Sequence, residues 1–119
     1  MSQRFSGALL ALSLVFPAVS WATCAREADG SDICAFEQIQ MVYVTQTGPI
    51  YLMPTSSLAP SSTNFSCTPV AGRYVELNPA APNFKAMYAA ILSARVVGAT
   101  VTLVMDPSQS VCTIAYVTL

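Results

Sequence analysis

The four cysteines set the strongest limit on how this chain can fold. They stand at Cys24, Cys34, Cys67 and Cys112, all after an apolar leader. An even number of cysteines in a short exported domain indicates disulfides, and three pairings are possible. We favour Cys24–Cys34, which closes a short loop around Gly30, together with Cys67–Cys112. A four-cysteine zinc site is the alternative, but the sequence has no C-x₂-C pair.

The expectation of export comes from the first residues of the chain. Arg4 gives the leader a positive start, and residues 7–16 form an apolar run that is too short to span a bilayer. Pro17 ends this run. The small residues Ser20 and Ala22 then occupy the −3 and −1 positions of a signal-peptidase site.

We therefore predict a signal peptide over residues 1–22 and a single domain over residues 23–119, secreted or periplasmic. No stable membrane insertion is expected after cleavage. An uncleaved N-terminal membrane anchor is one alternative. A lipoprotein is another, because Cys24 follows closely, although Trp21 and Thr23 depart from the residues that a lipobox prefers.

Composition excludes several classes of function. The chain has 119 residues, 54% of them hydrophobic and 9% charged, with a net charge of −1. This length suits one domain, and the charge gives no basic footprint for nucleic acid. Because the chain has no His, it has neither a histidine acid–base catalyst nor a histidine metal ligand. We expect no enzyme, no cofactor and no bound metal.

Residues 36–47 alternate in the manner of a half-buried strand. Ile39, Met41 and Tyr43 share one face of this strand, and polar and apolar residues mix on the other. A loop rich in Ser, Thr and Pro is expected over residues 54–64. The remaining strands are predicted at residues 50–53, 72–77, 99–105 and 111–119.

One helix is predicted between the third and fourth strands. It runs from about Phe84 to Val97, with Asn83 as its N-cap and Gly98 as a left-handed stop. The order β-β-β-α-β-β predicts a mainly β chain folded as a five-stranded OB-like Greek-key barrel. The apolar stripe of the helix consists of Phe84, Met87, Tyr88, Ile91 and Leu92.

The opposite face of this helix carries small residues where a surface helix normally carries charge. One interpretation is a weakly polar, exposed face. The other is a face that a neighbouring subunit covers, and on this basis we predict a homo-oligomer. The candidate interface residues are Ala86, Ala89, Ala90 and Ser93.

The C-terminal half resembles a known family. The segment NPAAPNFKAMYAAILSARVVGATVTLVMD, followed by CTIAYVTL, is similar to the helix and two strands that end the B subunits of pentameric bacterial toxins. The resemblance is strongest to the subtilase-cytotoxin and pertussis-like branch. Short uncharacterised exported bacterial proteins end in a similar way. The shared positions are Phe84, Leu92 and Ala94, then Gly98, then Val101 and Leu103.

The resemblance implies an OB barrel, a ring with a pentamer as the first expectation, and recognition of a surface glycan or glycoprotein. It also implies an enzymatic toxin subunit as a possible partner. Hydroxyl and amide groups beside an aromatic face suit sugar hydroxyls. The candidate ligand-binding residues are Thr45, Gln46, Thr47 and Tyr51. They are otherwise ordinary strand and turn residues, and a protein-interaction or structural domain of the cell envelope with no small ligand is the alternative function.

Catalysis would require a different set of residues. With all cysteines paired no thiolate remains, and Lys85 is the one lysine that could serve as a base. A glycosidase pair of Glu76 and Asp106 or a calcium loop in residues 27–32 is conceivable. We expect the carboxylates of the mature chain to be solvated instead. They are Glu27, Asp29, Asp32, Glu37, Glu76 and Asp106.

Overall fold

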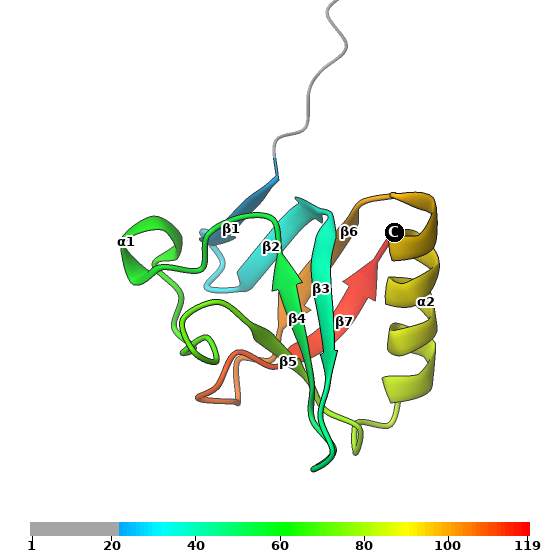
Figure 1. Ribbon diagram of the computed structural model, residues 1–119. Coiled ribbons are helices and arrows are strands. Elements are labelled where there is room, and N and C mark those ends of the chain that lie inside the picture. The colour runs from blue at the N-terminus through cyan, green and yellow to red at the C-terminus, as the bar shows by residue number, and fades with distance from the viewer. Residues whose placement is uncertain (1–21) are drawn as a thin grey trace, which may run out of the picture.

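The computed structural model describes residues 22–119 and is mainly β (Figure 1). The signal peptide predicted over residues 1–22 thus falls, apart from Ala22, outside the described residues. The strands are β1 (Thr23–Arg26), β2 (Asp32–Glu37), β3 (Ile39–Val44), β4 (Ile50–Pro54), β5 (Val75–Leu77), β6 (Val101–Met105) and β7 (Ile114–Thr118). The helices are α1 (Pro60–Thr63) and α2 (Phe84–Val97).

The expected count of five strands and one helix needs correction. The segment around Gly30 is not a plain loop: it is the turn of a hairpin between β1 and β2. The long strand predicted over residues 36–47 divides at Gln38 into β2 and β3. The short helix α1 lies in the loop predicted over residues 54–64, and the strand expected at residues 72–77 is limited to β5.

The strands form two open sheets, so the closed five-stranded barrel predicted from the strand order is not observed. One has the order β1-β2-β6-β7 and the other the order β3-β4-β5, with antiparallel pairing throughout. Gln38 carries the chain from the first sheet into the second. On the opposite side the sheets approach again, because the Glu76 amide donates to the Cys112 carbonyl at 2.8 Å and the Cys112 amide donates to the Thr68 carbonyl at 3.0 Å.

The core lies between the two sheets and α2. Leu52 and Val75 from one sheet and Leu103 from the other are fully buried, as is Ile91 of the helix. Figure 1 shows α2 standing beside β7 at the edge of the first sheet. The larger buried set comprises Ile39, Ile50, Leu58, Leu77, Met87, Ala94, Val101, Met105 and Ile114.

Helix α2 has the bounds that the sequence predicts. Gly98 ends it in the left-handed conformation at φ 71°, which glycine adopts without a Cβ penalty. Asn83 holds the N-cap position, but its side chain makes no capping hydrogen bond. Its amide donates instead to the Ala115 carbonyl at 3.1 Å, so Asn83 fastens the start of the helix to β7.

The face assignment in β3 is wrong at one position. Ile39 is buried, whereas Met41 and Tyr43 are exposed, although strict alternation would put all three on one face. The pairing of β3 with β4 shifts register between Ile39 and Met41. An extra residue in one strand of a pair reverses the faces of the residues that follow it, and this accounts for the difference.

The disulfides are Cys24–Cys34 and Cys67–Cys112, the pairing that the sequence favours. Cys24 and Cys34 are directly opposite each other in the β1–β2 hairpin. Two disulfides fit an extracellular or periplasmic protein, because such compartments are oxidising. Within residues 22–119, no helix has the length and apolar character needed to cross a membrane.

Candidate functional site

The predicted ligand-binding residues gather around the β3–β4 hairpin. Thr45, Gln46 and Thr47 form its turn, and Tyr51 lies in β4. The Thr45 hydroxyl donates to the Pro49 carbonyl at 2.7 Å and lies 3.3 Å from the Thr47 hydroxyl oxygen. Thr45 is thus partly used in holding the turn, while Gln46 and Thr47 remain exposed.

Tyr51 is the middle member of a row of three tyrosines, which we call the tyrosine row. Its ring stacks on Tyr43 of β3 at 6.4 Å between ring centroids and meets Tyr74 at 6.3 Å. Tyr43 is 55% exposed, so the row opens to solvent. Glu76 of β5 pairs with Tyr51 in register and places a carboxylate next to the aromatic rings.

Sequence reasoning identified Tyr51 and missed its two neighbours. Tyr43 and Tyr74 are 31 positions apart in the sequence. Only the pairing of β3, β4 and β5 brings them together. The signal available in the sequence was the two-residue period of β3 and β4, which puts exposed side chains of paired strands on the same face.

A second polar surface lies below the start of α2. A pocket of about 400 Å³ lies between the residues that lead into the helix and the β6–β7 loop. Amide and carboxylate side chains line it, and the predicted sites did not include them. Its polar lining residues are Asn78, Asn83, Asp106, Gln109 and Thr113.

Two carboxylates that were expected to be solvated are buried. Asp32 is 4% exposed and Glu37 is fully buried. Asp32 has the hydrogen bonds that burial requires: its Oδ2 accepts from the Ser66 hydroxyl at 2.6 Å, the Ser66 amide at 3.0 Å and the Cys67 amide at 3.2 Å. Asp32 therefore holds the backbone at Ser66 and Cys67, where the chain reaches the Cys67–Cys112 disulfide. It is not available to a calcium loop in residues 27–32.

Glu37 reaches the interior through a β-bulge. Cys34 and Glu37 are three residues apart and would point to opposite faces of a regular strand. The pairing of β2 with β6 shifts register between them, and Phe36 takes a positive φ of 55°. As a result Phe36 is 49% exposed while Glu37 has no exposed surface. Hydrophobicity alone would favour a buried Phe36 and an exposed Glu37, and the bulge produces the opposite arrangement.

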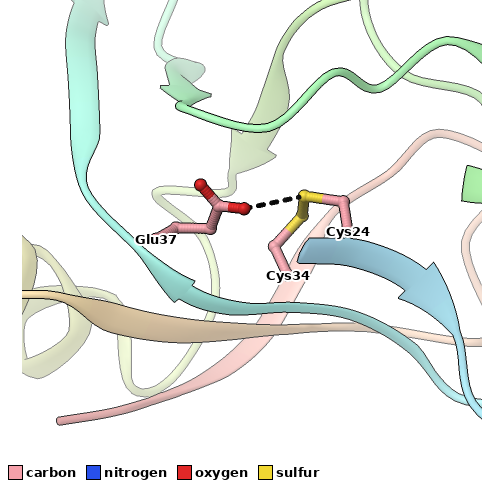
Figure 2. A group of neighbouring side chains, drawn as sticks. All are labelled: Cys24, Cys34 and Glu37. Atoms are coloured by element: carbon pink, nitrogen blue, oxygen red, sulfur yellow. Dashed lines mark hydrogen bonds between the residues drawn. A yellow bond between two sulfur atoms is a disulfide. The ribbon is translucent and has the colours of Figure 1, made fainter. Parts of the chain in front are cut away.

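The buried Glu37 carboxyl faces the Cys24–Cys34 disulfide (Figure 2). Its Oε1 lies 3.5 Å from the Sγ of Cys24, and its Oε2 accepts from the Ser56 amide at 3.0 Å. A disulfide sulfur carries no proton, so a hydrogen bond from Cys24 to Glu37 requires the thiol form of the cysteine. The one N–H donor that residues 22–119 offer to Glu37 is the Ser56 amide.

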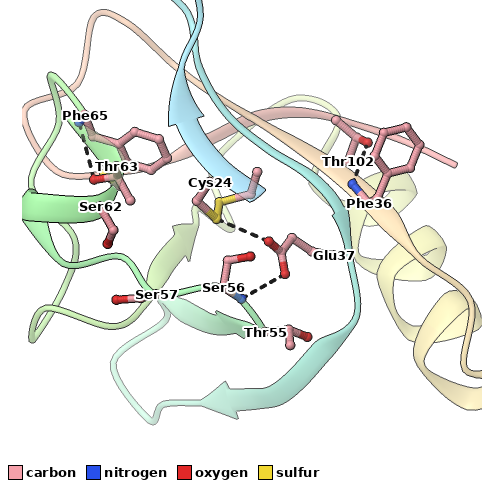
Figure 3. Close-up of a disulfide and its surroundings, with 12 residues drawn as sticks. Cys24, Phe36, Glu37, Thr55, Ser56, Ser57, Ser62, Thr63, Phe65 and Thr102 are labelled. Carbon is pink, nitrogen blue, oxygen red and sulfur yellow. Dashed lines mark hydrogen bonds between the residues drawn. A yellow bond between two sulfur atoms is a disulfide. The ribbon is translucent and has the colours of Figure 1, made fainter. Parts of the chain in front are cut away.

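The Cys24 side of this cluster borders a small hollow. It has a volume of about 280 Å³ and is lined by Cys24 of β1 and by serines of the loop that follows β4. Figure 3 shows Ser56, Ser57 and Ser62 beside the disulfide, with the Ser56 amide bonded to Glu37. We call Cys24, Cys34, Glu37 and Ser56 the disulfide–carboxyl cluster.

Hydrogen bonds within turns alter the acidity of two carboxylates, the half-buried Asp106 and the exposed Asp29. The Ser108 hydroxyl and then the Ser108 amide, at 2.7 and 2.9 Å, lower the pKa of Asp106. The Ser31 amide, at 2.9 Å, lowers the pKa of Asp29 in the same way. In both cases hydrogen bonds to the charged form favour it, as turns led by Asp commonly do.

The predicted interface face of α2 is largely open to solvent. Ala86, Ala89 and Ser93 are exposed and Ala90 is half-buried. At the end of the helix, Val96 is 85% exposed and Val97 is 76% exposed. An uncharged strip therefore runs along the outer side of α2 and ends in two exposed valines.

A comparison of the chain with family models, curated proteins and solved structures found no match.

Proposed function

We propose that this chain is an exported, non-catalytic binding protein with an OB-like fold that recognises a surface glycan or glycoprotein, as toxin B subunits do. The observation that carries the proposal is the tyrosine row. Aromatic faces stack on the apolar faces of sugar rings, and the neighbouring Glu76 carboxylate and Thr47 hydroxyl suit sugar hydroxyls.

The OB-like fold is supported by the way in which the two sheets approach each other. In the OB-like arrangement we infer, β2 and β3 together act as one bent strand, and β5 meets the residue that precedes β7 at the parallel bridge between Glu76 and Thr113. The hairpin β1–β2 adds a strand outside this arrangement. The connection by α2 between β5 and β6 agrees with the order of an OB fold.

The exposed strip on α2 supports assembly into a homo-oligomer, with a pentamer as the first expectation from the resemblance. Small side chains allow another backbone to come close, and exposed apolar residues gain free energy when they are covered. Ala89→Glu places a charge in the middle of this strip without changing buried residues. It should convert the oligomer to monomers in light scattering, with the circular dichroism spectrum unchanged.

The direct test of recognition is a glycan array probed with the exported protein and its variants. Tyr51→Ala should weaken binding roughly two- to tenfold, the range expected from loss of one aromatic stacking contact. Tyr116→Ala is the control for loss of a tyrosine ring, because Tyr116 is exposed and lies on β7 in the other sheet, whereas Tyr51 is half-buried. An array without any bound glycan, or equal losses for the two variants, would contradict the proposal.

The α2 strip also supports the second candidate, a protein-interaction domain of the cell envelope. This candidate predicts that Ala89→Glu abolishes capture of a protein partner while the glycan array stays blank. Binding of a glycan that depends on Tyr51 decides between the two.

A further inference from the structure

We propose that the dithiol form of this protein binds Zn²⁺ through Cys24, Cys34 and Glu37. The proposed site shares no residue with the tyrosine row, and the proposal does not depend on sugar recognition. The three ligand atoms, two sulfurs and one carboxylate oxygen, lie within 4.8 Å of one another and all three residues are buried.

The distances suit a tetrahedral site. With Zn–S near 2.3 Å and Zn–O near 2.0 Å, a sulfur and an oxygen bound to the same ion are about 3.5 Å apart. The Cys24 Sγ and the Glu37 Oε1 are already separated by 3.5 Å. Once the disulfide is open, the two sulfurs need a separation of about 3.8 Å, which rotation of the cysteine side chains can provide.

The bulge in β2 is the feature that most needs an explanation. It holds Phe36 at a positive φ and exposes its ring so that a carboxyl group can enter the core. A positive φ strains the backbone of a bulky residue, and such positions cluster at functional sites. Without the bulge Glu37 would point away from Cys34, and no third ligand would exist.

The residues around the cluster supply two further features of a zinc site, an outer-shell hydrogen bond and access from solvent. The Ser56 amide holds Oε2 at 3.0 Å and so directs Oε1 toward the sulfurs, as outer-shell hydrogen bonds do at metal sites. The hollow lined by Cys24 and Ser56 gives the ion a route from solvent and leaves a fourth position for water or a Ser56 hydroxyl. Three protein ligands with one open position is an ordinary arrangement for zinc.

Conversion of the zinc-bound thiolates to the disulfide requires a two-electron oxidant, and a second protein disulfide can serve as one. The chain is synthesised with thiols, and binding of one Zn²⁺ to Cys24 and Cys34 releases two protons. Oxidation by a protein disulfide then removes two electrons from the two sulfurs, joins them, and expels the ion. The acceptor disulfide takes both electrons and two protons and becomes a dithiol.

The other disulfide offers no equivalent site. Asp32 lies near Cys67, but its Oδ2 already accepts three hydrogen bonds from Ser66 and Cys67. Among residues 22–119, Cys24, Cys34 and Glu37 are the one group of three Cys, Asp or Glu ligand atoms close enough to share a metal ion, and Cys67 and Cys112 belong to no such group. The two cysteine pairs of the same chain therefore supply a matched comparison.

The experiment is a Co²⁺ titration of the protein reduced with a phosphine, which donates two electrons to each disulfide and becomes a phosphine oxide. Thiolate ligands give Co²⁺ a charge-transfer band in the near ultraviolet, and added Zn²⁺ should remove it. The second readout is the melting temperature of the reduced protein, which equimolar Zn²⁺ should raise because the ion binds the folded form.

Four variants locate the site. Cys24→Ser with Cys34→Ser should abolish the band, and Cys67→Ser with Cys112→Ser should keep it. Glu37→Gln should weaken Co²⁺ binding at least about tenfold, the lower end of what loss of even an outer-shell partner costs. Asp32→Asn, the control for removal of a buried carboxylate, should leave the affinity unchanged.

Each result decides for or against the proposal. The pattern just described supports it. Equal affinity of Glu37→Gln and the unaltered protein would overturn it, since an unfolded chain with four thiols would bind Co²⁺ without regard to Glu37. A reduced protein whose melting temperature does not rise with Zn²⁺, or one that stays unfolded in its presence, would overturn it as well.

Discussion

The two disulfides of this protein each have a buried carboxyl group nearby, and the two carboxyl groups are treated very differently. Asp32, near Cys67–Cys112, accepts hydrogen bonds from three donors. Glu37, beside Cys24–Cys34, accepts from one amide and directs its other oxygen at a sulfur. Similar burial thus serves two purposes: Asp32 organises a loop, whereas Glu37 keeps an unused acceptor in the interior.

The largest effect in this comparison is expected from the disulfides themselves. The Cys67–Cys112 bond closes a sequence separation of 45 residues and the Cys24–Cys34 bond one of 10. Loop-closure entropy gives about 4 kcal/mol for the long loop and about 3 kcal/mol for the short one. Denaturant unfolding of Cys67→Ala with Cys112→Ala should show the greater loss. A greater loss for Cys24→Ala with Cys34→Ala would indicate that the hairpin contributes more than its loop entropy.

Loss of the Asp32 carboxyl should follow closely. Asp32→Ala leaves the Ser66 and Cys67 amides without an acceptor in a buried site, so we expect a loss of about 3 kcal/mol. Unfolding in urea measures it, with Asp29→Ala as the control because Asp29 is exposed. A loss under 1 kcal/mol would show that water replaces the carboxylate without cost.

The backbone at Phe36 provides a smaller and more specific effect. Phe36→Gly and Phe36→Ala both remove the aromatic ring and differ by one Cβ at a position with φ 55°. Glycine should give the more stable protein by about 1 kcal/mol, the reverse of the usual order in strands. Chemical unfolding of both variants checks this, and a more stable alanine variant would mean that the bulge relaxes when the ring is removed.

The smallest effect concerns Asp106, a half-buried carboxylate in the β6–β7 loop. The Ser108 hydroxyl and amide lower the pKa of Asp106, so its contribution to stability is present above the ordinary pKa of 3.8 and disappears as the pH falls through the lower folded value. Asp106→Asn should therefore be slightly less stable than the unaltered protein near pH 6. The two should converge in acid, and a thermal-unfolding series from pH 6 to pH 2 tests the convergence.

Much of the fold could be predicted because its signals are local. The apolar stripe of α2 has helical spacing and Gly98 marks its end, so the bounds of the helix follow from the sequence. The disulfide pairing followed from loop lengths and from the expected strands. The hairpin β1–β2 was missed because its residues are mostly small or charged, which is typical of a loop.

The sites could be predicted only in part, because they depend on strand pairing. Tyr51 was identified, but its contacts with Tyr43 and Tyr74 require the register of three strands. Glu37 was expected in solvent, as most carboxylates are. No local pattern reports a bulge that exchanges Phe36 for Glu37 in the interior, so the disulfide–carboxyl cluster is visible only in three dimensions.

We infer that Glu37 is buried for a purpose other than stability, and the unfolding free energies of Glu37→Gln and Asp32→Asn in the oxidised protein test this inference most directly. Both changes keep the shape of the side chain and replace one carboxyl oxygen with an amide nitrogen. Asp32→Asn should lose about 2 kcal/mol, because one of the two oxygens that accept hydrogen bonds from Ser66 and Cys67 is lost in a buried site. Glu37→Gln should lose less than about 0.5 kcal/mol or gain stability. A loss for Glu37→Gln equal to or greater than that for Asp32→Asn would contradict the account.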